Sequence, residues 1–480
     1  MSLKEKTIFG FIWTLIQQLS TQGIAFINSI ILARLLEPKD FGLIGMIAIF
    51  ITIAKVLMDS GLTSSLIRSK DPDQEDYSSV FVINLIGSVV MYLLLFMLAP
   101  LIANFFNQKI LVDIIRVYSL VIIIQAFSAV QLTKLTKEMN FKTQLTISIP
   151  SLILSGALGI ILALYEFGVW SLVYMQLSSA LFLSIQLWVR INWKPSLNIN
   201  IEKLKYHFNF GYKLAIASII NSIFDNIYNI IIGKLYTPAL LGYYTRAQGV
   251  RKLPMDSIAT TINKVTYPLF AAINNENSKL KDVYSKLMQQ VLYWVMPLMI
   301  VLGIIAEPLF RILFTEKWLP AVPYFHILCI AGIMYPLNKY NLNILNVKGR
   351  SDLFLKLEII KKALVIMSLF LVIPFGIYGL VWGQVALSII GFLINSSYSG
   401  KLLNYSTSKQ IKDILPIVLI SINTGIIVRL VDMQFITIPE NDIIRLIIAT
   451  LTAITLYFIL SISFHINAFY DFIALVKSKK

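Results

Sequence analysis

Apolar stretches of about 20 residues recur from one end of the chain to the other, and a stretch of that length can cross a bilayer as an α-helix. The composition agrees, because 57% of the 480 residues are hydrophobic, only 14% are charged and the mean hydropathy is +0.76. The sequence therefore predicts an all-α polytopic membrane protein with about fourteen transmembrane helices. We expect these spans near residues 9–36, 42–67, 79–104, 110–133, 144–165, 168–190, 208–235, 241–270, 287–313, 320–346, 356–375, 377–400, 413–432 and 443–465.

Basic residues are distributed unevenly between the two sets of span ends. Most of the 41 Lys and Arg residues lie at the alternating set that includes Lys4, Arg68 and Lys137, and few lie at the other set, which includes Lys109. Because cytoplasmic flanks are enriched in Lys and Arg, this bias predicts that both termini are cytoplasmic. Much of the net charge of +16 is thus a topology signal, and we expect no nucleic-acid partner.

The sequence shows no pattern typical of an enzyme or a metal site. It has no GxxxxGK[ST] phosphate-binding motif, and its three histidines, His207, His326 and His465, lack metal-ligand spacing. The single cysteine, Cys329, excludes an internal disulfide and a thiolate cluster. We therefore expect no catalytic residues, no bound metal and no cofactor.

The chain contains an internal repeat. The hexapeptide KVLMDS at 55–60 returns as KLPMDS at 252–257, and IILARLLEPKDFGL at 30–43 aligns with IIIGKLYTPALLGY at 230–243 at an offset of 200. A unit of six spans enters the membrane in the same direction twice, so the two copies are parallel repeats that face each other across a central cavity. The predicted divisions are a first six-helix lobe at 1–205, a second at 206–405 and two further helices at 406–480.

The repeated hexapeptide places charge inside apolar spans. Lys55 and Asp59 are four residues apart and share a helix face, as do Lys252 and Asp256. One interpretation is an ion pair that neutralises itself. The other is a basic site near the middle of the membrane, to which Arg251 adds a cation, since charges at that depth usually face a wet cavity.

Two matched spans carry polar stripes on otherwise apolar helices. The first includes Gln18 and Gln22, and the seventh includes Asn221 and Asn229. Such side chains either line the cavity or hydrogen-bond between helices. Asp225 lies in the polar stripe of the seventh span, and Asp59 and Asp256 are further carboxylates within spans.

Several runs resemble the bacterial polysaccharide transporter family of the MOP flippase superfamily, of the lipopolysaccharide, colanic acid and teichuronic acid exporter type. The resemblance covers roughly residues 5–405. The runs that carry it are IILARLLEPKDFGLIGM (30–46), GLTSSLIRSKDPDQEDYSSVFVINL (61–85), LGYYTRAQGVRKLPMDSIATTINKVTYPLFAAI (241–273), FTEKWLPAVPYFHIL (314–328) and LNVKGRSDLFLKLEIIKK (345–362).

The resemblance implies a flippase that moves an undecaprenyl-diphosphate-linked oligosaccharide across the bacterial cytoplasmic membrane by alternating access. Such export serves O-antigen, capsule or exopolysaccharide biosynthesis, with membrane lipids, a polysaccharide polymerase and a chain-length regulator as candidate partners. A diphosphate requires cations, for which we select Lys55, Arg251 and Lys252. Arg246, in the YYTRAQ run, is either a fourth cation of this site or a snorkelling anchor.

The resemblance also implies coupling to an ion gradient, of H⁺ or Na⁺. Among the carboxylates within spans, Asp225 is the first candidate for this role, and Asp59 and Asp256 are the further candidates.

Within the same chemistry, the chain could instead flip another lipid, such as a peptidoglycan precursor. Three alternatives of other classes also remain open at this stage. A multidrug-type antiporter of the same superfamily needs an acidic and aromatic cavity, whereas the span interiors here are basic. A membrane polymerase or ligase needs a long outer loop with reactive residues, and the links between spans are short. A scaffold that organises glycosyltransferases does not require the repeated polar stripes.

Overall fold

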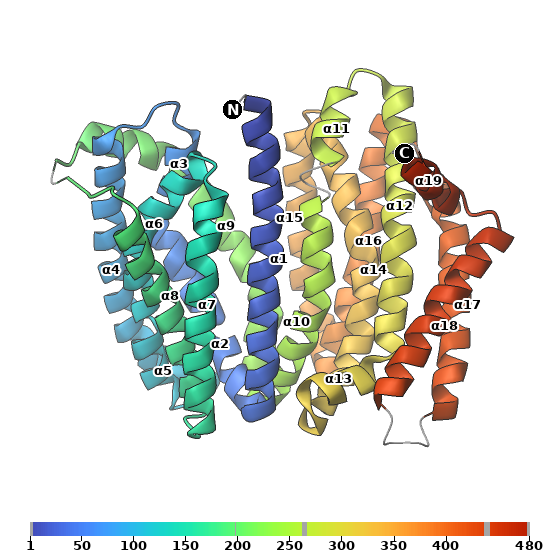
Figure 1. The fold of residues 1–480 in the computed structure, drawn as a ribbon, viewed down its shortest axis with the longest axis horizontal. Coiled ribbons are helices and arrows are strands. Elements are labelled where there is room, and N and C mark those ends of the chain that lie inside the picture. The colour runs from blue at the N-terminus through green and yellow to red at the C-terminus, as the bar shows by residue number, and fades with distance from the viewer. Residues whose placement is uncertain (1–2, 197, 262–265, 436–441, 478–480) are drawn as a thin grey trace. The chain divides into compact units, whose positions relative to one another are not determined.

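The computed structural model describes residues 3–196, 198–261, 266–435 and 442–477, and these residues contain helices and no strand. The packing divides the chain into two compact units, 1–245 (unit 1) and 246–480 (unit 2), which are described separately (Figure 1). The helices that begin in unit 1 are α1 Leu3–Leu35, α2 Pro38–Asp59, α3 Leu62–Arg68, α4 Gln74–Phe106, α5 Leu111–Tyr118, α6 Leu120–Lys137, α7 Phe141–Leu164, α8 Val169–Arg190, α9 Ile201–Leu235 and α10 Pro238–Thr261.

Unit 2 continues α10 from Arg246 onward. Its further helices are α11 Tyr267–Ala272, α12 Asn277–Ile304, α13 Ala306–Phe314, η2 Glu316–Ala321, α14 Val322–Val347, α15 Ser351–Val372, η3 Ile373–Phe375, α16 Gly376–Leu403, α17 Thr407–Phe435, α18 Asp442–Ser463 and α19 Asn467–Lys477.

Eleven helices or joined helices among the described residues are long and apolar enough to cross a membrane. The predicted spans 356–375 and 377–400 fall together in one of them, Ser351–Leu403. The predicted spans 9–36 and 241–270 are not among the eleven, and the second of these coincides with α10, which carries several charged residues. The polytopic all-α fold is therefore confirmed, and the number fourteen stays a prediction.

Local sequence signals explain where several helices begin. Pro38 is the first residue of α2, where its missing N–H costs no hydrogen bond, and Glu37 and Asp40 form a capping box around it. Asp73 and Asp76 form the corresponding box at the start of α4. The corner between α2 and α3 places Gly61 at φ 71°, in the left-handed region that favours glycine.

The internal repeat is visible in the helix boundaries. α1 ends at Leu35 and α2 begins at Pro38, just as α9 ends at Leu235 and α10 begins at Pro238. Each copy also places a short helix, α5 or α13, after its long α4 or α12. The sequence repeat thus encodes a repeated order of helices.

The first turns of α2 and α10 pack against each other inside unit 1. A Cβ added at Gly42 would lie 1.7 Å from the carbonyl oxygen of Pro238, and one added at Gly242 would lie 1.9 Å from that of Pro38. Both distances are far shorter than a van der Waals contact, so only glycine fits at either position. The glycine of each copy therefore lies against the proline of the other copy, as a local two-fold relation between these two turns produces.

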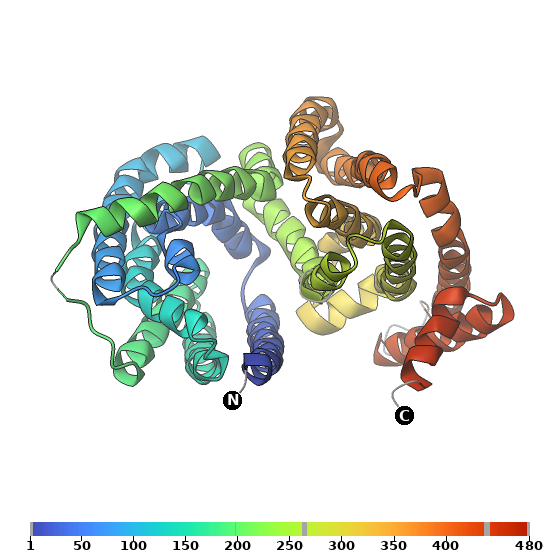
Figure 2. The ribbon, with the colours of Figure 1, turned by 90° about the horizontal axis from the view of Figure 1, so that it is seen from above.

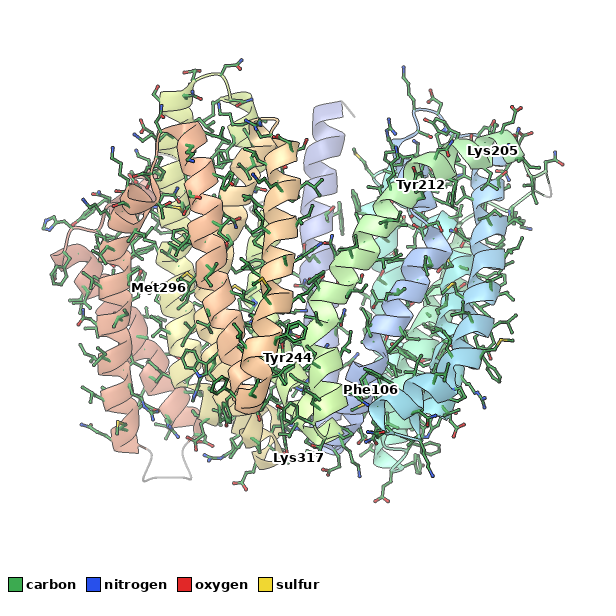
Figure 3. The ribbon with its side chains drawn as sticks, turned by 180° about the vertical axis from the view of Figure 1, so that it is seen from behind. Phe106, Lys205, Tyr212, Tyr244, Met296 and Lys317 are labelled. Carbon is green, nitrogen blue, oxygen red and sulfur yellow. The ribbon has the colours of Figure 1, made fainter. Side chains whose placement is uncertain are left out.

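Helix α9 belongs to unit 1 by its packing, although it opens the second copy of the repeat. It packs along α2, α3 and α4, and Figure 2 shows it lying across one side of unit 1. Its early residues Lys205 and Tyr212 lie toward the end of unit 1 opposite Phe106, the last residue of α4 (Figure 3). The divisions at 1–205, 206–405 and 406–480 follow the sequence repeat and stay a prediction, since the compact units divide within α10.

Aromatic side chains fill the core of each unit. In unit 1, Phe81 meets the rings of Trp188 and Trp193 edge-on at centroid distances of 6.0 and 5.9 Å. In unit 2, Tyr284 and Tyr340 pack edge-on at 6.2 Å beside Phe270. These ring contacts hold α4 against α8 in unit 1 and α12 against α14 in unit 2.

Candidate functional site

The two charged residues of the first hexapeptide do not form an ion pair in the structure. Asp59, at the end of α2, accepts hydrogen bonds from the backbone N–H (3.2 Å) and the hydroxyl (3.0 Å) of Thr63 in α3. Lys55, one turn earlier, is half-buried, and it makes no hydrogen bond or ion pair within the described part of the chain. Asp59 therefore caps a helix, and the positive charge of Lys55 is left uncompensated by it.

The cations of the second copy differ from one another in their surroundings. Arg246 is 9% exposed, and its guanidinium carbon lies 4.9 Å from the ring centroids of both Phe314 and Trp318. Arg251 is half-buried against α14, where its Cγ lies 3.7 Å from the position of a Cβ added at Gly332. Lys252 is exposed on the same helix. Arg246 is thus enclosed by aromatic rings, and Lys252 is the most accessible of the three.

Two further residues of this helix were singled out by the sequence. Asp256 lies outside the residues whose side chains the structure describes. Pro254, in the repeated hexapeptide KLPMDS, lies inside the continuous helix α10. The predicted pairing of Lys252 with Asp256 stays untested.

The polar stripe of α1 serves partly to join helices. Asn28 Nδ2 donates a hydrogen bond to the carbonyl oxygen of Leu152 in α7 (3.1 Å), and Gln17 Nε2 donates to Gln144 Oε1 in the same helix (3.4 Å). Gln18 and Gln22, the predicted cavity-lining residues, are half-buried. Interhelical bonding thus accounts for two members of this face of α1, and a cavity role for Gln18 and Gln22 stays a prediction.

The polar stripe of α9 has a different character. Asn229 Nδ2 donates to Asn226 Oδ1 (3.4 Å), and Asn226 Nδ2 donates to the carbonyl oxygen of Ser222 (2.9 Å), so these bonds lie within the helix. Asn221 and Asp225 are exposed. The stripe therefore presents an amide and a carboxylate outside the packed core of unit 1.

The predicted residues are divided between the two units. Lys55 and the two stripes lie in unit 1, whereas Arg246, Arg251 and Lys252 lie in unit 2. Their meeting in one central cationic cavity remains a prediction.

Sequence reasoning missed a pocket inside unit 2. It has a volume of about 380 Å³ between α12, α14 and α17, and its polar residues are His326, Cys329 and Arg429. In the sequence, His326 shows no metal-ligand spacing and Cys329 has no second cysteine to pair with, so neither residue indicated a pocket. Arg429 Nη1 donates a hydrogen bond to Asp432 Oδ2, one turn later in α17, at 3.1 Å.

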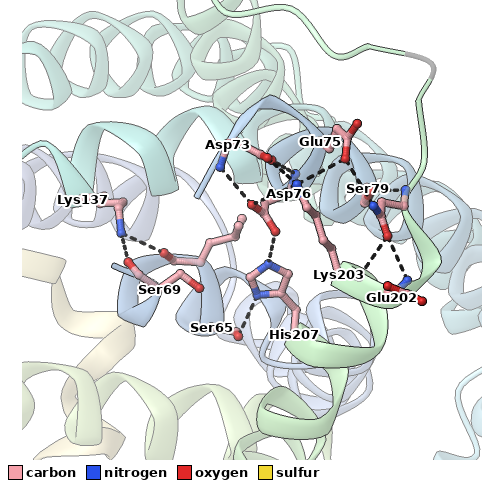
Figure 4. A network of polar contacts seen from close by, with 12 residues as sticks. Ser65, Ser69, Asp73, Glu75, Asp76, Ser79, Lys137, Glu202, Lys203 and His207 are labelled. Carbon is pink, nitrogen blue, oxygen red and sulfur yellow. Dashed lines mark hydrogen bonds and ion pairs between the residues drawn. The ribbon is translucent and has the colours of Figure 1, made fainter. Parts of the chain in front are cut away.

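A buried histidine holds α9 to unit 1 (Figure 4). His207 is fully buried, with its Nε2 3.1 Å from Asp76 Oδ1 in α4 and its Nδ1 2.8 Å from Ser65 Oγ in α3. A carboxylate only accepts, so Nε2–H donates to Asp76, and Nδ1 of a neutral ring then accepts from the Ser65 hydroxyl. Since Ser65 is also buried, the arrangement joins three helices and does not expose a nucleophile.

The same cluster continues to the surface. Lys203, one turn before His207, forms ion pairs with Asp73 and, at 3.2 Å, with Glu75. The pKa of Asp73 is lowered to about 2, first by the Lys203 hydrogen bond and then by the backbone N–H of Asp76. We call Ser65, Asp73, Asp76, Lys203 and His207 the His207 network.

A second network lies in unit 2. Arg445 of α18 donates two hydrogen bonds to Asp432 of α17, at 2.5 and 2.9 Å, and their side chains are 5% and 0% exposed. Arg311 of α13 donates to Asp442 at 3.1 Å and to Glu307 at 2.9 Å. These residues together with Arg429 form the Arg445 network.

Comparisons with known proteins place the chain in a family. The sequence matches the family described as polysaccharide biosynthesis protein over residues 31–323. It is 26% identical over 430 residues to the teichuronic acid biosynthesis protein TuaB of Bacillus subtilis, covering 89% of each chain. It is also 26% identical over 407 residues to the lipopolysaccharide biosynthesis protein WzxC of Escherichia coli, covering 82% of this chain and 79% of the other.

The fold is similar to that of a solved flippase. The lipid II flippase MurJ in an inward closed conformation superposes with a TM-score of 0.73 at 17% identity, covering 95% of this chain and 99% of MurJ. At that identity the likeness shows the fold alone. The family resemblance drawn from the sequence is confirmed: the chain belongs to the polysaccharide biosynthesis protein family and is a multi-pass helical membrane protein.

Proposed function

We propose that the protein is a flippase that moves an undecaprenyl-diphosphate-linked oligosaccharide repeat unit across the bacterial cytoplasmic membrane by alternating access. The observation that carries this proposal is the family match over residues 31–323. The likeness to MurJ supports this proposal, because MurJ has a similar fold and is a lipid II flippase. The exported unit serves a surface polysaccharide such as O-antigen, capsule or exopolysaccharide.

In this proposal the substrate's diphosphate is bound by cations of α2 and α10. Lys55, left uncompensated by Asp59, and the exposed Lys252 are the residues to which we assign direct contact. Arg251 supplies a third positive charge with several N–H donors. Arg246, enclosed by Phe314 and Trp318, is assigned to positioning α10 rather than to the ligand.

Transport is coupled to an ion gradient through a carboxylate. Asp225 is the candidate we favour, because it is exposed on the polar stripe of α9, whereas Asp59 already accepts two hydrogen bonds from Thr63. The coupling ion is H⁺ or Na⁺. Gln18, Gln22, Asn221 and Asn229 supply amides for the glycan.

The proposed orientation places both termini in the cytoplasm, following the distribution of Lys and Arg. A polysaccharide polymerase and a chain-length regulator act on the exported unit in this scheme. The chain itself transports and is assigned no catalytic step.

The experiment that tests this proposal measures the substrate pool in the host. The gene is deleted, undecaprenyl-diphosphate-linked oligosaccharides are quantified by mass spectrometry, and their sidedness is read with an impermeant glycan probe. We expect accumulation on the cytoplasmic face, reversed by the wild-type gene. An unchanged pool in a host without a redundant exporter would exclude a lipid-linked glycan as the substrate and favour a multidrug-type antiporter.

Complementation with variants then tests the cations. Lys55→Ala combined with Lys252→Ala is expected to abolish export at normal membrane abundance. The matched control, Lys70→Ala with Lys205→Ala, removes two exposed lysines near helix ends and should leave export intact. Wild-type export by the first double variant would remove both lysines from the mechanism.

A further inference from the structure

A basic groove lies at one end of unit 1, apart from every residue assigned to transport. It has a volume of about 670 Å³ and is formed by the ends of α6 and α8, the starts of α4 and α7, and the segment that follows α8. Three cations line it: Lys134, Arg190 and Lys194. Glu138 is the one carboxylate among the lining residues. The groove therefore favours an anion.

Neutral hydrogen-bonding groups surround these cations. Asn140, Thr143 and Asn192 also line the groove, and they add amide and hydroxyl groups beside the positive charges. Arg190 Nη1 donates to the carbonyl oxygen of Thr146 at 3.2 Å, which orients the guanidinium at the groove, and a guanidinium carries five N–H donors in all. Phosphate oxygens are the acceptors that suit such a set, because they take several charge-assisted hydrogen bonds at once.

The floor of the groove is fixed before any ligand binds. Trp193 Nε1 donates to Gln74 Oε1 at 2.7 Å, and Gln74 Nε2 donates back to the carbonyl oxygen of Lys194 at 2.6 Å. Trp193 is 6% exposed and packs on Phe81. The segment after α8 is thus fastened to the start of α4, so a ligand would bind a preformed surface at low entropic cost.

An apolar stripe on α8 leads to the groove. Leu181, Ile185 and Val189 are spaced by four residues and are 45%, 50% and 76% exposed, and Arg190 follows directly. A soluble phosphate compound has no apolar chains to bury against this stripe, whereas the acyl chains of a lipid can pack on it. Basic residues next to a helix end at the membrane surface attract anionic headgroups.

We propose that this groove binds the phosphate headgroup of an anionic phospholipid, whose acyl chains lie along Leu181, Ile185 and Val189. The bound lipid contacts the segment between α8 and α9, where the first copy of the repeat passes into the second. The site is an accessory lipid site and does not depend on the identity of the transported glycan.

The test uses the full-length protein purified in detergent. Phosphatidylglycerol is titrated in, retained lipid is measured by native mass spectrometry, and phosphatidylcholine serves as the zwitterionic comparison. Lys134→Gln, Arg190→Gln and Lys194→Gln together are expected to weaken phosphatidylglycerol binding by about ten- to a hundred-fold, given the usual contribution of each basic residue near a membrane surface. Phosphatidylcholine binding should not change.

The control removes the same charge elsewhere in unit 1. Lys70→Gln, Lys205→Gln and Lys213→Gln alter three exposed lysines outside the groove and should leave binding unchanged. Equal weakening by both triple variants would overturn the proposal, since net charge alone would then explain the effect.

A second measurement leaves the cations in place. Cys329, the native cysteine, is buried, so Asn192→Cys introduces an accessible thiol at the groove. Its maleimide labelling should slow in phosphatidylglycerol nanodiscs relative to phosphatidylcholine nanodiscs. Absence of protection would overturn the site, and equal protection by inorganic pyrophosphate in phosphatidylcholine nanodiscs would overturn the lipid assignment in favour of a soluble phosphorylated ligand.

Discussion

The two polar networks hold helices together by different means. The Arg445 network in unit 2 is built around a guanidinium and a carboxylate that are almost fully buried, with side-chain exposures of 5% and 0%. The His207 network in unit 1 has a buried imidazole at its centre and becomes progressively more exposed, from Asp76 at 15% to Asp73 at 56%. One joins α17 and α18 through a buried guanidinium and carboxylate, and the other joins α9 to α3 and α4 through a buried imidazole and more exposed carboxylates.

The difference sets how each network responds when a partner is lost. A buried ion left without its counter-ion carries a large desolvation penalty, whereas an exposed ion is hydrated again. The penalty for leaving a buried hydrogen-bonding group without its partner falls between these two penalties. The predictions below test this order, from the largest expected effect to the smallest.

The largest effect is expected at Asp432. Asp432→Ala leaves the Arg445 guanidinium buried without its bidentate partner, and we expect the free energy of unfolding to fall by about 3–5 kcal/mol. The measurement is denaturant or thermal unfolding of the purified protein. The extent of unfolding is monitored by the rate of proteolysis of α17 and α18.

A double variant separates charge burial from packing. Asp432→Leu with Arg445→Met removes both charges and should recover most of the lost stability, because apolar residues of similar volume replace buried ion pairs at little cost. If the double variant unfolds as easily as Asp432→Ala, then uncompensated charge is not the cause.

A moderate effect is expected at His207. His207→Phe fills a similar volume but leaves Asp76 and Ser65 without their central partner, and the expected loss is about 1–3 kcal/mol. Cleavage by protease in the segment 191–200 should increase, since α9 loses its link to α3 and α4.

His207→Gln tests whether the hydrogen bonds themselves matter. Its amide can donate to Asp76 and accept from Ser65, so it should retain more stability than His207→Phe. Equal stability of the two variants would show that the ring contributes by packing alone, for example against Tyr206 at 5.3 Å.

The sequence predicted well those features that depend on residues close together in the chain, such as the positions of helices. Apolar length placed most helices, and the matched prolines, Pro38 and Pro238, begin α2 and α10 in the structure. The repeat at an offset of 200 also indicated Gly42 and Gly242, although not that each lies against the other's proline. That contact is tertiary, so periodicity cannot reveal it.

Charge partners were predicted less well, because several spacings allow a contact that tertiary structure decides. Lys55 and Asp59 are correctly spaced for an ion pair, but Asp59 caps α3 instead. His207 and Asp76 are 131 residues apart, and nothing in either local sequence links them. The candidate cations Lys55, Arg251 and Lys252 were likewise assigned from their positions in the spans, whereas their contacts depend on tertiary structure.

The smallest effect is expected at Asp73, in the exposed part of the His207 network. The pKa of Asp73 is lowered to about 2 in the folded protein, from an ordinary value of 3.8, by Lys203 and the backbone N–H of Asp76. A carboxyl with a depressed pKa stabilises the fold above its unfolded value, and that contribution is lost as the pH falls toward 2. Because the side chain is largely exposed, we expect less than about 1 kcal/mol.

Asp73→Asn isolates this contribution, since asparagine is as good an N-cap as aspartate and keeps the start of α4 intact. The difference in unfolding midpoint between wild type and Asp73→Asn should be constant from pH 7 to pH 5, narrow below pH 4, and shrink in 1 M salt, where exposed charges are screened. The difference caused by Asp432→Ala should persist in that salt, because buried pairs are screened much less. Equal salt sensitivity of the two differences would mean that burial does not separate the networks, and that the Arg445 pair is reached by solvent.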